Sequence, residues 1–402
     1  MESENFYIFT HQKHYVHISF NSSFLHTLAL AFPDSHLNIY AYQSHIDLLS
    51  KEVNIFSTSF FCLSELQVEK KSFKLLNRHL RLFIWTKEII QIFSKNKVDK
   101  FIFLDIGRHQ LYIIKILLFL KIILAKPRFF IVAHDIFEPL LWNNIPIKKF
   151  INSTFCWLPT LKNSFCYIVL SKHIEDYITT YYPEINLEIQ SLDHPAYTKY
   201  ISNKQVISCD NVDPYFQDKI SHSINFAFMG TPQKGIDEFI QIANNVKKNT
   251  MAKQKIQFFL AGYLGEDLIS TTAFDILTNP SVEPIGYDKY LDILSQSHYV
   301  LWFAFHNPYQ LRASGTIVEA IQLEKPIICL KNPLVSYYFQ RFGNIGYCCN
   351  SLDEITKLII RFSGEFPLEE YRTQIANLRS IKNNFAPRYI AQELKKIIKS
   401  NW

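Results

Sequence analysis

The chain has 402 residues, of which 48% are hydrophobic and 19% charged, which is enough for about two or three domains with sizeable cores and argues against disorder. Its 10 glycines exclude a glycine-rich or collagen-like protein, and a net charge of +6 is too mild for a dedicated nucleic-acid-binding protein. Its seven cysteines lack the paired spacing of a zinc site, which indicates reduced thiols in a cytoplasmic protein.

The N-terminus is acidic and lacks the basic-then-apolar order of a signal peptide, which also predicts a cytoplasmic location. Short apolar runs then alternate with longer helical patterns. Continuous apolar runs of this kind are typical of strands that are buried on both faces in a parallel sheet. The predicted strands of this first part are residues 6–9, 37–41, 101–104, 129–133 and 167–170.

Residues 70–87 mix lysine and arginine with phenylalanine, leucine and tryptophan, which predicts a basic amphipathic helix. Two interpretations stay open. The helix either docks on an anionic membrane near a lipid-linked acceptor or presents an ordinary solvated face. The first would make the protein peripheral on the inner face of the cytoplasmic membrane, and removing the charges would then reduce co-sedimentation with vesicles.

Residues 111–124 are apolar but contain Lys115 and Lys121, and Pro127 follows soon after. A membrane-spanning helix needs about 20 apolar residues without such charges. We therefore expect a helix that packs against the sheet rather than a span.

The second part repeats the alternation of strands and helices, which predicts a doubly wound α/β sheet with ligands at the carboxyl ends of its strands. Strands are expected at 225–229, 256–261, 299–303 and 326–330, and helices at 236–248, 287–295 and 316–323. The expected domains are 1–200, a linker at 201–224, 225–386, and an amphipathic C-terminal helix within 387–402.

The turn after the strand at 225–229 contains Gly230, Thr231, Lys234 and Gly235, and a helix follows it. Backbone N–H groups and the positive end of the helix meet at such a turn, where a phosphate can bind. Lys234 adds a cation that can reach a diphosphate. Taken alone, a turn of this kind is more often purely structural.

A second helix start lies at Ser314, Gly315 and Thr316, whose N–H groups are available to an anion. Glu319 is predicted to lie in the first turn of this helix. Its carboxylate can accept hydrogen bonds from a ribose diol there. The alternative is equally open at this point: Ser314 caps the helix and Glu319 complements the helix dipole.

Residues 225–350 resemble the C-terminal domain of group-1 glycosyltransferases of GT-B fold. The matching positions are Gly230, Lys234 and Gly235, then Ala261-Gly262, Val282 with Gly286, Gly315, Glu319-Ala320 and Pro326-Ile-Ile. The resemblance implies two Rossmann-like domains facing a central cleft, with a C-terminal helix that returns to the N-terminal domain. It also implies a nucleotide-diphosphate sugar held by the second domain.

Two positions depart from the family pattern. Thr231 replaces an arginine, and Leu311 replaces the first of two paired glutamates, which leaves the choice between retention and inversion open. Arg312 is our candidate replacement for the missing cation. If this is right, Arg312→Ala raises the KM for donor sharply, and an unchanged value would remove the idea.

In the first part, Ala133-His134-Asp135 follows a predicted strand, as a Thr-x-His-Asp segment does in the family. The resemblance implies that His134 contacts the donor sugar. From the residues alone, a His–Asp pair at the end of a strand is either an orienting or general-base pair or an ordinary loop histidine. Asp135 is the alternative base in an inverting enzyme.

Further histidines mark the acceptor side by the same resemblance. His11, His14 and His17 follow the first strand, but no acidic or cysteine partner completes a metal site with them, so we expect no metal. We assign His14 and His17 to an acceptor-side loop. His194, in Asp193-His-Pro, lines the cleft or forms a rigid domain-boundary turn.

The resemblance implies a hexosyltransferase of bacterial surface polysaccharide or glycoconjugate synthesis, acting on a saccharide or lipid-linked acceptor and without a cofactor. Two alternatives remain. One is a GT-B nucleotide-sugar epimerase, and the other is a non-catalytic relative that binds sugar or protein partners, in keeping with Thr231 and Leu311. The sequence does not specify the sugar, nucleotide, linkage, acceptor or oligomeric state.

Overall fold

The computed structural model describes residues 4–11, 17–53, 57–64, 74–95, 100–120, 127–141, 159–185, 187–197, 223–249, 255–264, 276–278, 280–303 and 307–400. The chain divides into two compact units. The first unit comprises residues 1–195, 311–313 and 387–402, and the second comprises 196–310 and 314–386. The predicted linker lies almost entirely outside the described residues, and the first strand of the second unit begins at Ser223.

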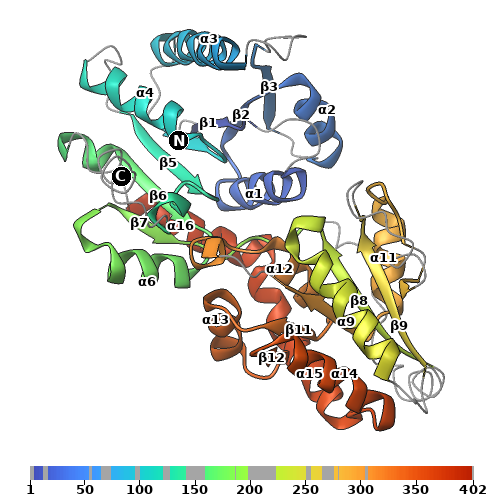
Figure 1. The fold of residues 1–402 in the computed structure, drawn as a ribbon. Coiled ribbons are helices and arrows are strands. Elements are labelled where there is room, and N and C mark those ends of the chain that lie inside the picture. Colours follow the sequence, from blue (N-terminus) through green and yellow to red (C-terminus); the bar gives the residue numbers. More distant parts are fainter. Residues whose placement is uncertain are drawn as a thin grey trace. The chain divides into compact units, whose positions relative to one another are not determined.

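The first unit contains a seven-stranded sheet in which every described pair of neighbouring strands is parallel (Figure 1). The strand order is β3-β2-β1-β4-β5-β6-β7. The central strands are almost wholly buried because crossover helices cover both faces of such a sheet. The strands are β1 (Asn5–Phe9), β2 (His36–Ala41), β3 (Thr58–Cys62), β4 (Lys100–Phe103), β5 (Arg128–Ala133), β6 (Phe165–Val169) and β7 (Ile189–Ser191).

Six α-helices are described in this unit, and the last of them comes from the C-terminus of the chain. Helix α16 packs against α1, and its buried residues share one hydrophobic cluster with residues of α1. The predicted returning helix is thus present. The helices are α1 (Ile18–Ala31), α2 (Gln43–Glu52), α3 (Lys74–Lys95), α4 (Arg108–Phe119), α6 (Lys172–Tyr181) and α16 (Pro387–Ser400).

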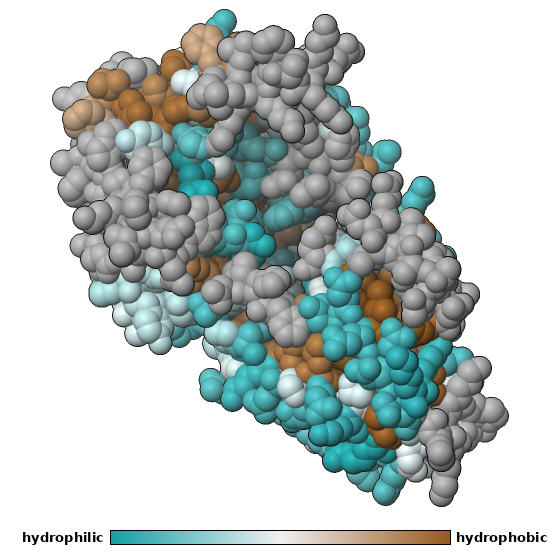
Figure 2. Space-filling view, viewed as in Figure 1, coloured by the Kyte–Doolittle hydropathy of each residue, from teal (hydrophilic) through white to brown (hydrophobic). Residues whose placement is uncertain are grey.

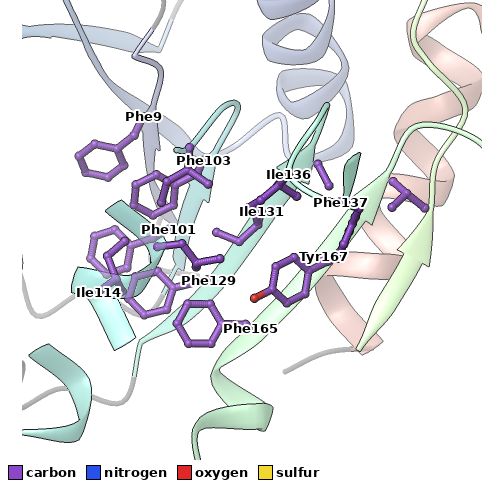
Figure 3. Packing of buried hydrophobic residues seen from close by; sticks show 14 of the residues in the cluster. Phe9, Phe101, Phe103, Ile114, Phe129, Ile131, Ile136, Phe137, Phe165 and Tyr167 are labelled. Atoms are coloured by element: carbon purple, nitrogen blue, oxygen red, sulfur yellow. The ribbon is translucent and has the colours of Figure 1, made fainter. Parts of the chain in front are cut away.

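An aromatic row on one face of the sheet forms the centre of the core (Figure 3). Phe101, Phe129 and Phe165, from three neighbouring strands, stack with ring centroids 5.5 and 5.1 Å apart. Each of these rings is at most 3% exposed. Offset stacking of buried rings adds to the free energy gained from the buried area, which explains why phenylalanine is so frequent in this sequence.

The second unit contains a five-stranded parallel sheet in the order β12-β11-β10-β8-β9. Its strands are β8 (Ser223–Gly230), β9 (Lys255–Gly262), β10 (Tyr299–Trp302), β11 (Ile327–Leu330) and β12 (Gly346–Cys349). Its α-helices are α9 (Ile236–Asn249), α11 (Tyr287–Gln296), α12 (Gly315–Gln322), α13 (Pro333–Phe342), α14 (Leu352–Gly364) and α15 (Leu368–Ile381).

Three strands were not predicted: β3, β7 and β12, all at sheet edges. Edge strands pair on one side only and can be short or partly exposed, so they lack the continuous apolar run of a central strand. Helix α1 begins at Ile18, and Asn21 is buried within it.

The apolar segment at 111–124 forms part of α4, which ends at Phe119; residues 121–126 lie outside the described residues. Lys115 is only 3% exposed, and its ammonium lies 5.6 Å from the ring centroid of Phe165. The side chain therefore packs as part of the helix–sheet interface. None of the helices within the described ranges has the length and apolar character needed to span a membrane.

Candidate functional site

The turn after β8 has the form that the sequence predicted. Gly230 and Gly235 have φ angles of 125° and 102°, a region that side chains other than glycine rarely adopt. Between them, Pro232–Lys234 forms one turn of 3₁₀ helix, and α9 follows directly. A Cβ atom on Gly235 would lie 2.5 Å from the Cβ of Phe303, so this turn packs closely against the residue that follows β10.

The start of α12 is the second predicted phosphate-facing element. Ser314 is its N-cap residue in an extended conformation, but its hydroxyl caps no N–H group and is buried without a hydrogen-bond partner. Ser314 is therefore the N-cap residue by position, as the alternative expected, but its side chain makes no cap. The first turn of α12 contains no acidic residue, because Glu319 lies one turn further along than predicted. An uncapped helix start without nearby carboxylates is suited to an anion.

The two helix starts meet through Lys234. Its Nζ donates a 2.6 Å hydrogen bond to the Oγ1 of Thr316, in the first turn of α12. Loss of hydration on burial lowers the pKa of Lys234, and the charge of Glu319 acts in the opposite direction. Two turns that are 82 residues apart in sequence thus lie together, with one cation between them.

Glu319 is held by a residue that the sequence analysis did not identify. The hydroxyl of Tyr290, on α11, donates a hydrogen bond of 2.9 Å to Oε2 of Glu319. The other oxygen of a carboxylate fixed in this way keeps acceptor capacity for a diol. Tyr290 stands four residues after Gly286, and its spacing alone gave no signal of this contact.

Arg312 and Leu311 belong to the first unit. Leu311 is 1% exposed in the hydrophobic cluster that contains the aromatic row, and the guanidinium of Arg312 forms an ion pair with Glu138. The structure therefore gives Arg312 a carboxylate partner within the first unit. Its role in donor binding stays a prediction.

In the first unit, three of the predicted histidines gather around Phe20 of α1. The His134 ring lies 4.4 Å from the Phe20 ring and 4.6 Å from that of His17, and His194 lies 4.9 Å from Phe20, measured between centroids. His134 follows β5, His17 precedes α1 and His194 follows β7. The parallel sheet therefore brings all three to one edge. Asp135 is exposed, and His14 lies outside the described residues.

His134 has the properties of a neutral base. Burial lowers its pKa well below the usual value, and His17 and His194 lower it further, while Asp105 and a hydrogen bond to the backbone of Leu104 act in the opposite direction. Its Nε2 atom is buried without a hydrogen-bond partner. A neutral imidazole with a bare nitrogen can accept a proton from a hydroxyl group.

Asp105 is the main residue that sequence reasoning missed. It follows β4 and accepts hydrogen bonds from the hydroxyl of Thr10 (2.6 Å) and the backbone N–H of His11 (2.7 Å). Burial raises the pKa of Asp105, but the side chain of His11, together with these two bonds, lowers it overall. Trp85 Nε1 donates a hydrogen bond to Nε2 of His11, so the imidazole of His11 belongs to this hydrogen-bond network and is not a free base. The sequence did contain a signal for Asp105, because this residue comes after strand β4 just as His134 comes after strand β5.

No group of three or more histidine, cysteine, aspartate or glutamate side chains is placed to hold a metal ion among the residues that the structure describes. The rings of His17 and His134 contact each other edge to face, and His134 and His194 each contact the ring of Phe20 in the same way. Their arrangement is that of packed imidazoles.

We expect His134→Gln to flatten the loss of stability on acidification. Because the pKa of His134 is lower in the folded state, the unfolded chain binds more protons as the pH falls below about 6.5, and stability present above that pH is progressively lost. Urea unfolding should show the variant losing about 1–2 kcal/mol less than wild type between pH 7.5 and 5. The exposed His109→Gln is the control, and equal slopes for His134→Gln and wild type would contradict the assignment.

Comparison with solved structures settles the fold. A glycosyltransferase from Rickettsia africae is 11% identical, with a TM-score of 0.65 over 100% of this chain and 99% of that one. WaaG, a glycosyltransferase involved in lipopolysaccharide biosynthesis, is 11% identical, with a TM-score of 0.62 over 98% and 99%. The chain has the GT-B fold.

HepE from Anabaena, solved in complex with UDP-glucose, shares this fold at 13% identity, with a TM-score of 0.63 over 98% of this chain and 99% of that one. A comparison with family models found no match, and neither did a comparison with curated proteins. The predicted fold class is confirmed, including both parallel sheets and the returning helix. Structural similarity at such low sequence identity shows only that the fold is shared. The function has to be argued from the residues of the site.

Proposed function

We propose that the chain is a glycosyltransferase that uses a nucleotide-diphosphate sugar. The observation that supports this most is the 2.6 Å bond from Lys234 to Thr316, which places a cation between two helix starts in the second unit. Two sets of backbone N–H groups and one ammonium suit a diphosphate better than a single phosphate. HepE, which was solved in complex with UDP-glucose, has the same fold.

In this proposal the diphosphate occupies the turn from Gly230 to Gly235 and the start of α12, with Thr231, Ser314, Gly315 and Thr316 around it. Lys234 stabilises the negative charge that develops on the leaving diphosphate, which is the main contribution available without a metal. On binding, a dianion would replace Thr316 as the partner of Lys234 and raise the pKa of its ammonium. Glu319 accepts hydrogen bonds from the ribose diol.

On the acceptor side we propose His134 as the residue that takes the proton of the attacking hydroxyl. Its Nε2 atom has no hydrogen-bond partner, and its lowered pKa keeps the imidazole unprotonated at neutral pH; His17 and His194 shape the surroundings. Leu311 stands where retaining relatives have a carboxylate, and it is buried in the core of the first unit. That position therefore supplies no carboxylate to the transferred sugar.

A panel of nucleotide sugars tests this function. Titration calorimetry with UDP-, GDP- and ADP-sugars measures donor binding, and product analysis with saccharide and lipid-linked acceptors separates transfer from hydrolysis and epimerisation. Donor binding with transfer supports the proposal. An epimer released without acceptor would show an epimerase, and a donor that binds without turnover would show a non-catalytic relative. Failure of every nucleotide sugar to bind would remove the proposal.

Tyr290→Phe is expected to weaken recognition of the ribose. Without its hydroxyl, Glu319 loses the bond that orients it, so the preference for a ribonucleotide donor over its 2′-deoxy analogue should fall about 3- to 10-fold, with kcat little changed. The ratio of kcat/KM values for the two donors measures this. Tyr337→Phe on α13, whose hydroxyl accepts a bond from Arg341, is a matched control. A normal preference in Tyr290→Phe would show that Glu319 does not need this bond.

We also propose that the first unit docks on an anionic membrane through α3 and α4. The predicted basic helix is present from Lys74 onward, and residues 70–73 lie outside the described residues. Phe83 is 67% exposed on α3, which packs beside α4, where Phe119 and Leu120 are also exposed. Figure 2 shows apolar surface gathered over this part of the unit. Exposed apolar side chains beside basic ones are typical of an interfacial helix.

Phe83→Asp should reduce binding to anionic vesicles by about tenfold or more, because one inserted phenylalanine contributes about 1.5–3 kcal/mol. Co-sedimentation with phosphatidylglycerol vesicles measures this, and phosphatidylcholine vesicles should bind less in every case. Tyr181→Asp on α6 replaces an equally exposed ring as a control. Equal binding of both variants would leave α3 as an ordinary solvated helix.

A further inference from the structure

Two cysteines face each other across the edge of the second sheet. Strands β11 and β12 run parallel with Cys329 paired to Cys348. Paired residues on neighbouring strands project to the same face, with Cα atoms about 4.8 Å apart, within the range of about 4.4–6.8 Å seen in disulfides. Both side chains pack with the same hydrophobic cluster, whereas Cys349 belongs to the cluster on the opposite face.

The surroundings of the two sulfurs differ in the way that an attacking and a resolving thiol require. The neighbouring Cys329 side chain and the charge of Lys331 lower the pKa of Cys348 to about 7, while the interaction with Cys348 and burial raise the pKa of Cys329. The Sγ of Cys329 also donates a hydrogen bond of 3.6 Å to the backbone carbonyl of Tyr347. Cys348 is partly exposed and Cys329 is fully buried. At neutral pH a large fraction of Cys348 is therefore thiolate and within reach of a small oxidant.

We propose that Cys348 and Cys329 form a peroxide-sensitive pair that closes a reversible disulfide between β12 and β11. This site is separate from the residues of the proposed donor site and does not rest on the proposed function. Strand β12 is the outer strand of its sheet, so it can move toward β11 without disturbing a neighbour on its other side. The small adjustment needed to bring the sulfurs into bonding distance is available there.

The chemistry balances with hydrogen peroxide as the two-electron oxidant. The Cys348 thiolate attacks one peroxide oxygen, the O–O bond breaks, and hydroxide leaves, which gives a sulfenic acid. The sulfur of Cys329 then attacks the sulfenic sulfur as its proton is lost. The S–S bond forms, the S–O bond breaks, and the departing hydroxide takes up that proton as water.

The experiment treats the full-length protein with hydrogen peroxide at pH 7, blocks remaining thiols and maps disulfides by peptide mass spectrometry. Wild type should give the Cys329–Cys348 linkage, reversed by dithiothreitol. Cys329→Ser should accumulate a dimedone-reactive sulfenic acid at Cys348. Cys348→Ser should give no such linkage, and Cys349→Ser, at the neighbouring buried thiol, should behave as wild type. A linkage that forms through other cysteines, or none, overturns the proposal.

A second measurement on the unmodified protein does not depend on the folding of variants. The rate of alkylation of Cys348 by iodoacetamide should rise with pH to a midpoint near 7. At pH 7 its reaction with peroxide should be about tenfold faster than that of a free cysteine, whose pKa of about 8.5 leaves it mostly protonated. A midpoint above pH 8 together with no linkage would reject Cys348 as the attacking thiol.

Discussion

Lys234→Met is expected to lower kcat/KM for the donor by about 100- to 1000-fold, the usual effect of removing one preorganised group that stabilises developing charge. In the structure this ammonium is partly buried and joins the two helix starts through Thr316. No other cation is placed there among the contacts described, because Arg312 is paired with Glu138 in the first unit. The loss should appear in kcat as well as in KM, since the charge develops mainly in the transition state.

Folding stability separates this effect from a structural one. Burial lowers the pKa of Lys234, so the charged form is disfavoured in the folded protein, and a methionine of similar length should cost little or nothing in free energy of unfolding. Steady-state kinetics and urea unfolding should be measured together. Lys357→Met, at an exposed lysine paired with Asp353 on α14, is the control. Full activity in Lys234→Met would remove the proposed donor site.

Gly235→Ala is expected to destabilise the second unit by about 2–4 kcal/mol. Its φ of 102° lies in a region that costs a residue with a side chain about 1–3 kcal/mol. The new Cβ would also approach the Cβ and carbonyl oxygen of Phe303 to 2.5 and 2.7 Å, a packing clash that typically adds about 1–3 kcal/mol. The turn must shift to relieve both, which moves Lys234 and the start of α9 away from the start of α12.

Donor affinity should therefore fall together with stability, as thermal unfolding with and without nucleotide sugar would show. Gly364→Ala provides the matched control, because no atom lies within 4 Å of its added Cβ at the end of α14. That variant should unfold like wild type. If Gly235→Ala kept the stability of wild type, the close packing of the turn against Phe303 would be wrong.

Much of the second unit could be predicted from local signals. Apolar runs located the strands β8, β9, β10 and β11, and the helices α9, α11 and α12 begin within one residue of the predicted starts. Glycines with positive φ at 230 and 235 mark the turn that we propose for the diphosphate, because few other residues adopt that backbone. These features depend on residues that are close together in the chain, so local sequence patterns predict them.

By itself, the sequence therefore determined the alternation of strands and helices, the turn with Lys234, and the second helix start at Gly315. Only the tertiary structure decided which distant residues meet: Tyr290 with Glu319, Arg312 with Glu138, Asp105 with Thr10, and the three histidines around Phe20. The physical reason is the parallel sheet, whose crossovers carry the carboxyl ends of strands that are far apart in the chain to one edge. Which side chains become partners there is set by strand order and register, and no local pattern records either.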